Sequence, residues 1–281
     1  MTQNECNHAN TASVIETLSV QEGIDQRAIV NSNAIIGTNV SIGPFSIIEG
    51  GVVIGDNVQI GAHAFIGAGS AIGRGCRIFH GVVIGTEPQD LKYRGEKTTV
   101  EIGEETVLRE YCTIHRGSSH RKKTTIGKRN YFMAYCHAGH DCVIGDNVIM
   151  ANAVNLGGHV VVEDFANLGG LVGVHQFVQI GKHAFIAGGY RVIKDVPPYI
   201  IAGGEPLEFC GLNTVGLARR GFTKEKIDEI KNVYRIVYRA NFNVTQAVKK
   251  IQSELSITPE IQEILNFVNS SQRGIIPAGR S

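Results

Sequence analysis

The chain of 281 residues has no tryptophan, few aromatic residues and no surplus of either charge. Its 27 Lys and Arg oppose 26 Asp and Glu, so the basic excess of a dedicated nucleic-acid-binding protein is missing. Because aromatic residues are few, the core must be mainly aliphatic. The length allows one large domain or two modest ones.

Signals for export, membrane insertion and disulfide bonding are also missing. Residues 1–10 are polar and lack the basic-then-apolar order of a signal peptide. No uncharged apolar run reaches the roughly 18 residues of a transmembrane helix. The cysteines are scattered without a CxxC pair, which favours reduced thiols: Cys6, Cys76, Cys112, Cys136, Cys142 and Cys210. We expect a cytoplasmic protein with no transmembrane segment.

What the sequence does contain is a repeat of six residues. Every sixth residue from Ile36 to Ile84 is isoleucine, and nearly every sixth residue onward to Val192 is apolar. The next position is often glycine, of which the chain has 34, about 12% against a usual ~7%. A period of six fits a short strand followed by a bend, where glycine permits unusual backbone geometry.

Three such segments make a triangular coil of 18 residues, and coils stacked about 4.8 Å apart form a parallel β-solenoid with isoleucine ladders inside. The only polar residues at the repeated position are Asp90, Glu96 and His120. They fall in two stretches, 86–101 and 115–125, where about twelve residues are expected to loop out each time. Long excursions from a regular scaffold are commonly functional.

The repeat ends at Pro197–Pro198, and a helical pattern follows. Thr223 is a candidate N-cap for a helix that continues through Tyr238, and residues 243–255 and 259–268 predict two more helices. We expect an N-terminal extension over 1–15, a solenoid over 16–204 and a helical domain over 205–281 that caps the last coil.

Stacking by 18 residues places His140, Gly158 and Gln176 one above another along one edge of the solenoid. His137, His159 and His175 lie within a few residues of this ladder. A neutral imidazole can accept a hydroxyl proton near pH 7, and a glycine N–H can approach an oxyanion closely. A lone histidine at a corner is most often structural, but four that converge favour general-base chemistry.

Other features of the sequence carry less weight. Asp141 could orient His140, although adjacent side chains on a strand point to opposite faces. No HExxH or cysteine-rich spacing supports a metal site, so we expect none. Asp90 and Lys92 in the first excursion could contact a sugar or belong to a solvated loop. Arg219–Arg220 could contact a phosphate or be a solvated basic pair.

Several motifs together resemble the bacterial UDP-N-acetylglucosamine O-acyltransferases that begin lipid A synthesis. The resemblance covers nearly the whole chain after about residue 15. It rests on PQDLKY (88–93), TIHRG (113–117), HAGHDC (137–142), GGH (157–159), GVHQF (173–177), DVPPY (195–199) and GLARRGF (216–222).

This resemblance implies a left-handed β-helix with a C-terminal helical domain, in a homotrimer with active sites between subunits. It implies transfer of a long, usually 3-hydroxy, acyl chain from acyl carrier protein to the glucosamine 3-hydroxyl of UDP-N-acetylglucosamine, without a cofactor. His140 matches the general base and Gly158 the oxyanion-hole donor. The matches that position the substrates are Asp90, Lys92, His115, His137, His159, His175, Gln176, Asn213, Arg219 and Arg220.

Gly188 matches a position where side-chain size limits acyl length, so glycine there is expected to admit a long chain. The sequence departs from the family at Val215, where many members carry an acidic residue two positions after the asparagine that contacts the nucleotide. Two alternatives remain open. A related enzyme could acylate a different acceptor, a 3-amino sugar nucleotide above all, or the solenoid could be a scaffold without catalytic activity.

Overall fold

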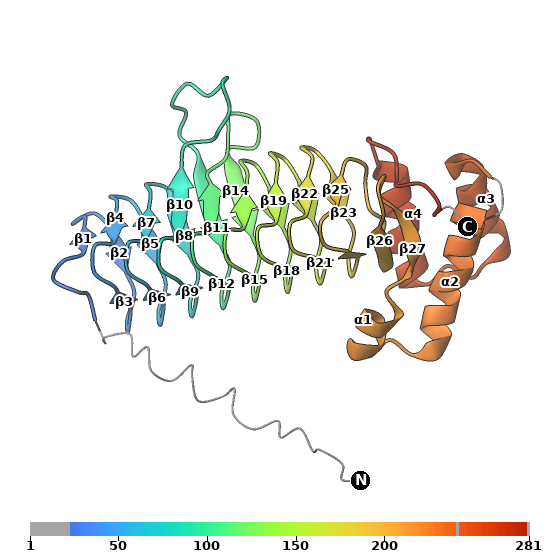
Figure 1. The fold of residues 1–281 in the computed structure, drawn as a ribbon, viewed down its shortest axis with the longest axis horizontal. Coiled ribbons are helices and arrows are strands. Elements are labelled where there is room, and N and C mark those ends of the chain that lie inside the picture. Colours follow the sequence, from blue (N-terminus) through green and yellow to red (C-terminus); the bar gives the residue numbers. More distant parts are fainter. Residues whose placement is uncertain (1–22, 240–241, 280–281) are drawn as a thin grey trace, which may run out of the picture.

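The computed structural model describes residues 23–239 and 242–279. The chain winds into a three-sided prism of stacked coils, followed by a group of helices at its C-terminal end (Figure 1). The predicted N-terminal extension over 1–15 lies outside the described residues. No helix in the described ranges is long and apolar enough to cross a membrane.

Each face of the prism is one sheet built from every third strand of the chain, parallel throughout except at the C-terminal end of the third sheet. The first sheet contains β1 (Ile29–Val30), β4 (Ile47–Ile48), β7 (Phe65–Ile66), β10 (Val83–Thr86), β13 (Thr113–His115), β16 (His137–Ala138), β19 (Asn155–Leu156), β22 (Gly173–Val174) and β25 (Arg191–Val192). The second contains β2 (Ile35–Ile36), β5 (Val53–Ile54), β8 (Ser70–Ile72), β11 (Thr99–Ile102), β14 (Lys123–Ile126), β17 (Val143–Ile144), β20 (Val161–Val162) and β23 (Gln179–Ile180). The third contains β3 (Ser41–Ile42), β6 (Gln59–Ile60), β9 (Arg77–Ile78), β12 (Val107–Leu108), β15 (Tyr131–Phe132), β18 (Ile149–Met150), β21 (Asn167–Leu168), β24 (Phe185–Ile186), β26 (Ile200–Gly203) and β27 (Glu208–Leu212).

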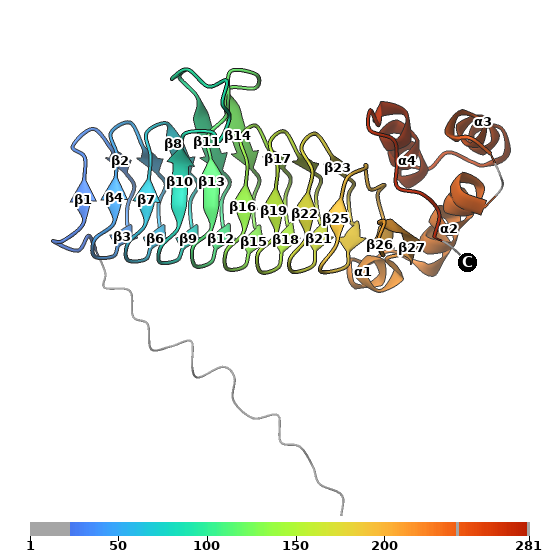
Figure 2. The same cartoon turned by 45° about the horizontal axis from the view of Figure 1, so that its top comes forward.

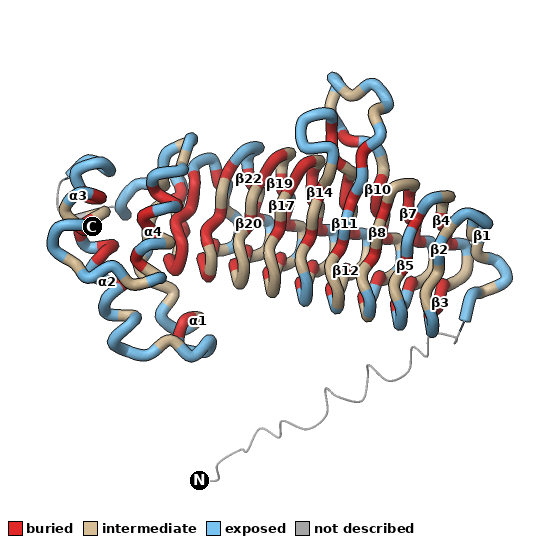
Figure 3. The backbone as a smooth tube through the Cα atoms, turned by 180° about the vertical axis from the view of Figure 1, so that it is seen from behind, coloured by how far each residue is buried: buried red, intermediate tan, exposed pale blue. Residues whose placement is uncertain are grey.

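The interior of the prism consists of the side chains that recur every six residues. Ile48 pairs with Ile66 and Ile66 with Ile84 in the first sheet, and all three are buried. These side chains point inward, as the hexapeptide pattern predicts, and the burial runs along the whole prism (Figure 3). The stacked aliphatic ladders form one continuous hydrophobic core.

Glycine follows these isoleucines for a different reason from the one expected. At Gly43 and Gly55 an added Cβ would lie 2.7 and 2.8 Å from a backbone nitrogen of the following coil. The bends themselves use left-handed backbone at larger residues, such as Phe45 at φ +60° and His63 at φ +56°. Glycine here therefore allows the close approach of successive coils.

Both excursions leave the prism at the edge between the first and second sheets, which we call the loop corner (Figure 2). The first loop spans residues 87–98 and the second 116–122, because the adjoining strands extend further than predicted. Ile84 pairs with Ile114, which confirms twelve extra residues in the first coil. Ile114 pairs with Ala138, so the second coil has only six extra residues, and the expectation of twelve there is wrong.

Stacking continues past Pro197–Pro198, where the six-residue repeat ends, since β26 still pairs in parallel with β24 before β27 turns back antiparallel. Four helices follow within the described ranges: α1 (Thr214–Arg219), α2 (Lys224–Arg239), α3 (Val244–Glu254) and α4 (Pro259–Ser270). The sequence predicted α2, α3 and α4 but missed the short α1. Thr223 accepts a hydrogen bond from the Lys226 N–H, as expected of an N-cap.

The helices are tied to the last coils by buried polar contacts. In α2, the Tyr234 hydroxyl donates to the carbonyl of Pro198 at 2.6 Å. After α4, the Ser271 hydroxyl donates to the Asp195 carboxylate at 2.6 Å. The helical group thereby covers the end of the hydrophobic core, which an uncapped solenoid would expose.

Candidate active site

His140 and Asp141 meet at the loop corner, one coil after the second excursion. The His140 Nδ1 and the Asp141 Oδ2 are 2.8 Å apart. Adjacent side chains on a strand would diverge, but Asp141 occupies the bend in the left-handed region, at φ +60°. The bend turns both side chains toward each other. The orienting contact that the sequence suggested for Asp141 is therefore present.

The second excursion loop closes over the carboxylate of Asp141, which is fully buried. The Ser118 N–H donates to Oδ1 at 3.0 Å, the Ser118 hydroxyl donates to Oδ2 at 2.5 Å, and the Arg121 N–H donates to Oδ1 at 3.2 Å. Burial acts to raise the pKa of Asp141, but the hydrogen bonds from Ser118 and His140 outweigh it and hold the pKa below its usual range. An ionised carboxylate accepts the proton of His140 Nδ1, which leaves Nε2 as the free basic nitrogen.

Gly158 lies directly above His140 on the next coil, as the 18-residue spacing predicts. The His159 N–H donates to the carbonyl of His140 at 2.9 Å, and the Phe177 N–H donates to the carbonyl of Gly158 at 3.2 Å. A Cβ built on Gly158 would lie 2.6 Å from both Nε2 and Cε1 of His140. Only glycine lets the backbone approach the imidazole this closely.

Further histidines surround the pair. His137 shares a hydrogen bond of 2.8 Å with the Thr113 hydroxyl, and its ring meets that of His115 edge to face. The His159 ring stacks on Phe177, and its Nε2 lies 3.7 Å from Asp141 Oδ2. Burial lowers the pKa of His115 to about 4 and also lowers the pKa of His137 and His159. These three imidazoles are therefore neutral at pH 7 and can donate or accept hydrogen bonds.

His175 and Gln176 are exposed on the coil above Gly158. The His175 Nδ1 contacts the Gln176 carbonyl at 3.0 Å. Both side chains are therefore open to a ligand that lies along the first sheet near His140.

His140, Asp141 and His159 could also offer three ligand atoms within 4.8 Å of one another to a metal ion. The Asp141 Oδ2 atom already accepts hydrogen bonds from the Ser118 hydroxyl and His140. A metal ion would have to displace both donors. The geometry is that of a hydrogen-bonded acid–base pair.

Asp90 and Lys92 lie at the same corner but in the first excursion, two coils before His140. Asp90 Oδ1 accepts a hydrogen bond from the Lys92 N–H at 3.0 Å, which shapes the tip of this loop. The Arg116 guanidinium donates to the Tyr93 hydroxyl at 3.1 Å and thereby connects the two loops. No hydrogen bond or ion pair within the described part of the chain joins Asp90 or Lys92 to His140.

The residues matched to the nucleotide lie at a different edge of the prism, between the second and third sheets, which we call the helix corner (Figure 1). Asn213 caps α1 by accepting from the Gly216 N–H, and its amide donates to the His183 carbonyl at 3.0 Å. The Arg220 guanidinium lies 4.6 Å from the centre of the Phe165 ring at this corner. Arg219 ends α1 and is exposed.

Gly188 lies at the third edge, between the third and first sheets, where an added Cβ would lie 2.9 Å from the Gly170 carbonyl oxygen. The structure thus assembles His140, Asp141, Gly158 and the buried histidines, but leaves Gly188 and the α1 residues apart from them. Ser118 could not be found from the sequence, because its contact with Asp141 depends on the path of a loop without periodicity.

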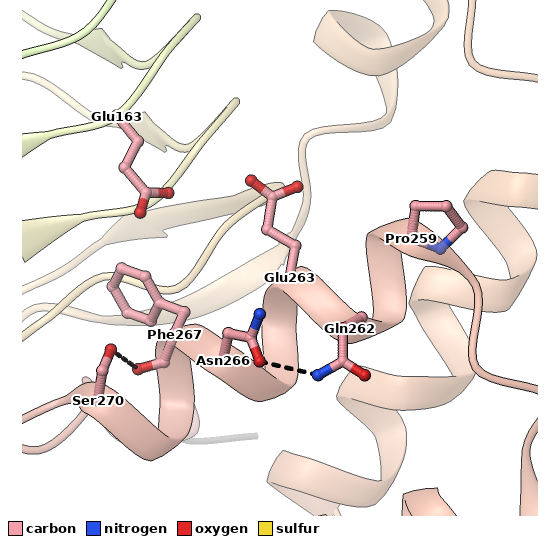
Figure 4. Close-up of a pocket in the computed structure, with 7 residues that line it drawn as sticks. All are labelled: Glu163, Pro259, Gln262, Glu263, Asn266, Phe267 and Ser270. Atoms are coloured by element: carbon pink, nitrogen blue, oxygen red, sulfur yellow. Dashed lines mark hydrogen bonds between the residues drawn. The ribbon is translucent and has the colours of Figure 1, made fainter.

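A separate cleft lies between β20 and α4 (Figure 4). Glu263 of α4 accepts a hydrogen bond from the Tyr199 hydroxyl and pairs with Lys182 at 3.3 Å, while Glu163 faces it from the solenoid. The described lining contains no histidine or cysteine, and it is completed by Pro259, Gln262, Asn266, Phe267 and Ser270. These contacts attach α4 to the coils.

Comparisons with known proteins agree with this geometry. A model of bacterial transferase hexapeptide repeats matches residues 33–68, 51–86 and 123–158, and a model of UDP-N-acetylglucosamine O-acyltransferase domain 2 matches residues 195–276. An acyl-[acyl-carrier-protein]–UDP-N-acetylglucosamine O-acyltransferase of Syntrophobacter fumaroxidans is 52% identical over 197 residues, which cover 69% of this chain and 76% of that protein. The chain belongs to the UDP-N-acetylglucosamine O-acyltransferase family.

Solved structures of the family have the same fold as this chain. A UDP-N-acetylglucosamine acyltransferase from Bacteroides fragilis is 44% identical, with a TM-score of 0.88 over 90% of this chain and 100% of that one. The enzyme from Francisella novicida is 39% identical, with a TM-score of 0.89 over 92% of this chain and 95% of that one. The prism is the left-handed parallel β-helix that the resemblance implied.

Proposed function

We propose that this chain transfers an acyl group, of the long 3-hydroxy kind that the resemblance implies, from acyl carrier protein to the 3-hydroxyl of UDP-N-acetylglucosamine, the first step of lipid A synthesis. The observation that carries the proposal is the contact of 2.8 Å between His140 and the buried Asp141, with the Gly158 backbone against the imidazole. This arrangement supplies a base and an oxyanion donor on successive coils. Family membership gives the substrates.

In the proposed mechanism, His140 Nε2 removes the proton of the sugar hydroxyl as the oxygen attacks the thioester carbonyl carbon. The Gly158 N–H, which donates no backbone hydrogen bond among the described residues, stabilises the oxyanion of the tetrahedral intermediate. Collapse breaks the carbon–sulfur bond, and the imidazolium returns its proton to the thiolate. Asp141 stabilises the imidazolium from the removal of the hydroxyl proton until the proton is returned. No acyl-enzyme or cofactor is required.

The remaining residues are proposed to position the two substrates. On the loop corner and first sheet these are Asp90, Lys92, His115, His137, His159, His175 and Gln176. Asn213, Arg219 and Arg220 are proposed to face the nucleotide, where Val215 offers no carboxylate. Gly188 is proposed to leave room for a long acyl chain.

These groups occupy different edges of one prism, so a single site that contains all of them needs a second copy of the chain. We propose a homotrimer in which the loop corner of one subunit meets the helix corner of the next. Exposed apolar side chains at the third edge support a further contact: Phe45, Tyr111, Tyr135 and Leu171. Leu171 is 72% exposed, which is unusual for a leucine in a regular fold.

Complementation between two inactive variants tests the shared site. His140→Ala and Arg220→Ala, each inactive alone, should regain part of the activity when coexpressed, because mixed trimers contain sites with both native residues. If each chain carried a complete site, every chain in the mixture would still be defective. Activity that stays at the level of the separate variants would therefore contradict the proposal.

The function itself is tested by a mass-spectrometric transfer assay with acyl carrier protein thioesters of different length and hydroxylation. A mono-acylated UDP-N-acetylglucosamine is the expected product, and the preferred donor identifies the chain length. Product only with a 3-amino sugar nucleotide would favour the alternative acceptor. The absence of product with every combination of donor and acceptor would favour the alternative of a scaffold without catalytic activity. The five cysteines in the described ranges are free thiols, which supports a reducing, cytoplasmic location as part of the proposal.

A further inference from the structure

The second excursion loop directs three hydrogen-bond donors at a single side chain, the carboxylate of Asp141. Ser118 is buried and directs both its backbone N–H and its hydroxyl at this carboxylate. The Arg121 N–H supplies a third donor at 3.2 Å. The Thr124 hydroxyl accepts a hydrogen bond from the Asp141 N–H at 2.8 Å and fixes the backbone beneath.

One oxygen of Asp141 serves two partners. Oδ2 accepts the Ser118 hydroxyl at 2.5 Å and His140 Nδ1 at 2.8 Å. The two donors therefore compete for the negative charge of the same atom. A change at Ser118 must alter how strongly this oxygen attracts the imidazole proton, although Ser118 itself forms no hydrogen bond with His140 among the described residues.

We propose that Ser118 is a positioning residue that holds the Asp141 carboxylate toward His140 and sets the basicity of the imidazole. The inference rests on the proposed function, since it assigns the loop a role in the general-base step. It explains why the excursion is folded over the acid–base pair. It also predicts that the basicity of His140 changes in a definite direction when Ser118 is replaced, which a residue needed only for folding would not cause.

The direction in which the basicity of His140 changes follows from the oxygen that it shares with Ser118. Without the Ser118 hydroxyl, Asp141 is stabilised by fewer donors, and more of its charge is directed to His140. The imidazolium of His140 in the variant therefore becomes more stable relative to the neutral base. The other titratable or charged groups around the pair are unchanged by the substitution. His115, His137 and His159 lie beside His140, His120 lies against the His159 ring, and Arg121 donates to the Asp141 carbonyl.

The experiment compares Ser118→Ala with Ser119→Ala, which changes the neighbouring exposed serine of the same loop. We expect Ser118→Ala to move the acid limb of the kcat profile to higher pH by about half a unit to one unit. The plateau kcat should fall roughly three- to tenfold because the carboxylate is held less firmly. The KM for the sugar nucleotide should stay the same, and Ser119→Ala should match the unmodified protein. Ser118→Cys, with a weak S–H donor of similar size, should give an intermediate shift.

A second readout does not need activity. The pH dependence of deuterium exchange at the imidazole C2 of His140, followed by mass spectrometry, reports its pKa directly and should show the same upward shift. A pKa of His140 that is unchanged, or lower, in Ser118→Ala would overturn the proposal. If the unmodified protein transferred no acyl group, the proposed function would fail while the exchange measurement still tested the contact.

Discussion

Replacement of Gly158 by alanine tests the geometry of the site with one methyl group. The new Cβ would lie 2.6 Å from Nε2 and Cε1 of His140, where ordinary contacts begin at 3.4 Å. The imidazole must therefore move away by roughly 0.8 Å, or the coil must shift by the same amount. Since a misplacement of about 1 Å can cost on the order of 10²-fold in rate, we expect kcat to fall about 100-fold, or about 2.7 kcal/mol.

The assay is steady-state acyl transfer from acyl carrier protein thioester to UDP-N-acetylglucosamine, with the thermal midpoint measured in parallel. Gly173→Ala, in β22 of the first sheet, is the matched control, because no atom lies within 4 Å of its added Cβ. It should keep nearly full activity. A Gly158→Ala variant with kcat within about threefold of the unmodified protein would refute the argument that Gly158 and His140 act in contact.

Three further predictions concern stability and assembly. Burial lowers the pKa of His183 to about 4, so the free energy of unfolding falls by up to about 3 kcal/mol as the pH drops from 6.5 toward 4. His183→Phe keeps a ring stacked on Phe165 and should flatten this pH dependence in urea titrations. An equally steep curve for the variant would contradict the assignment. Ile66→Ala should lower the free energy of unfolding by about 2–5 kcal/mol, and Ile35→Ala, at an exposed position, by far less. Equal losses would argue against an inward ladder of isoleucines. Leu171→Asp should dissociate the proposed trimer, as measured by light scattering, and an assembly of unchanged mass would remove this edge from the interface.

The repeated parts of the molecule could be predicted from the sequence, because one spacing determines them. A strict six-residue period specifies the inward side chain, the three-sided coil and the stacking of residues 18 apart. The ladder of His140, Gly158 and Gln176 follows from that count alone. The helices α2, α3 and α4 were also predictable, since their caps and apolar periodicity are local signals.

The parts that break the repeat could not be predicted. The length looped out of the second coil is six residues, and the pattern alone did not distinguish this from twelve. Alternation along a strand suggested that Asp141 points away from His140, but its position in a left-handed bend reverses this. Ser118 reaches Asp141 through a loop whose path depends on tertiary contacts. Glycine recurs because successive coils lie close together. The sequence shows the abundance of glycine but not this close approach.

The most direct test of the account is the rate of acyl transfer by His140→Ala, measured by mass spectrometry beside the unmodified protein. Removal of the base should lower kcat by about 10²–10⁴-fold, while the thermal midpoint and the mass of the assembly stay the same. Such a loss in an otherwise intact protein would support His140 as the general base. A rate within about tenfold of the unmodified protein would contradict the central claim that this imidazole removes the hydroxyl proton.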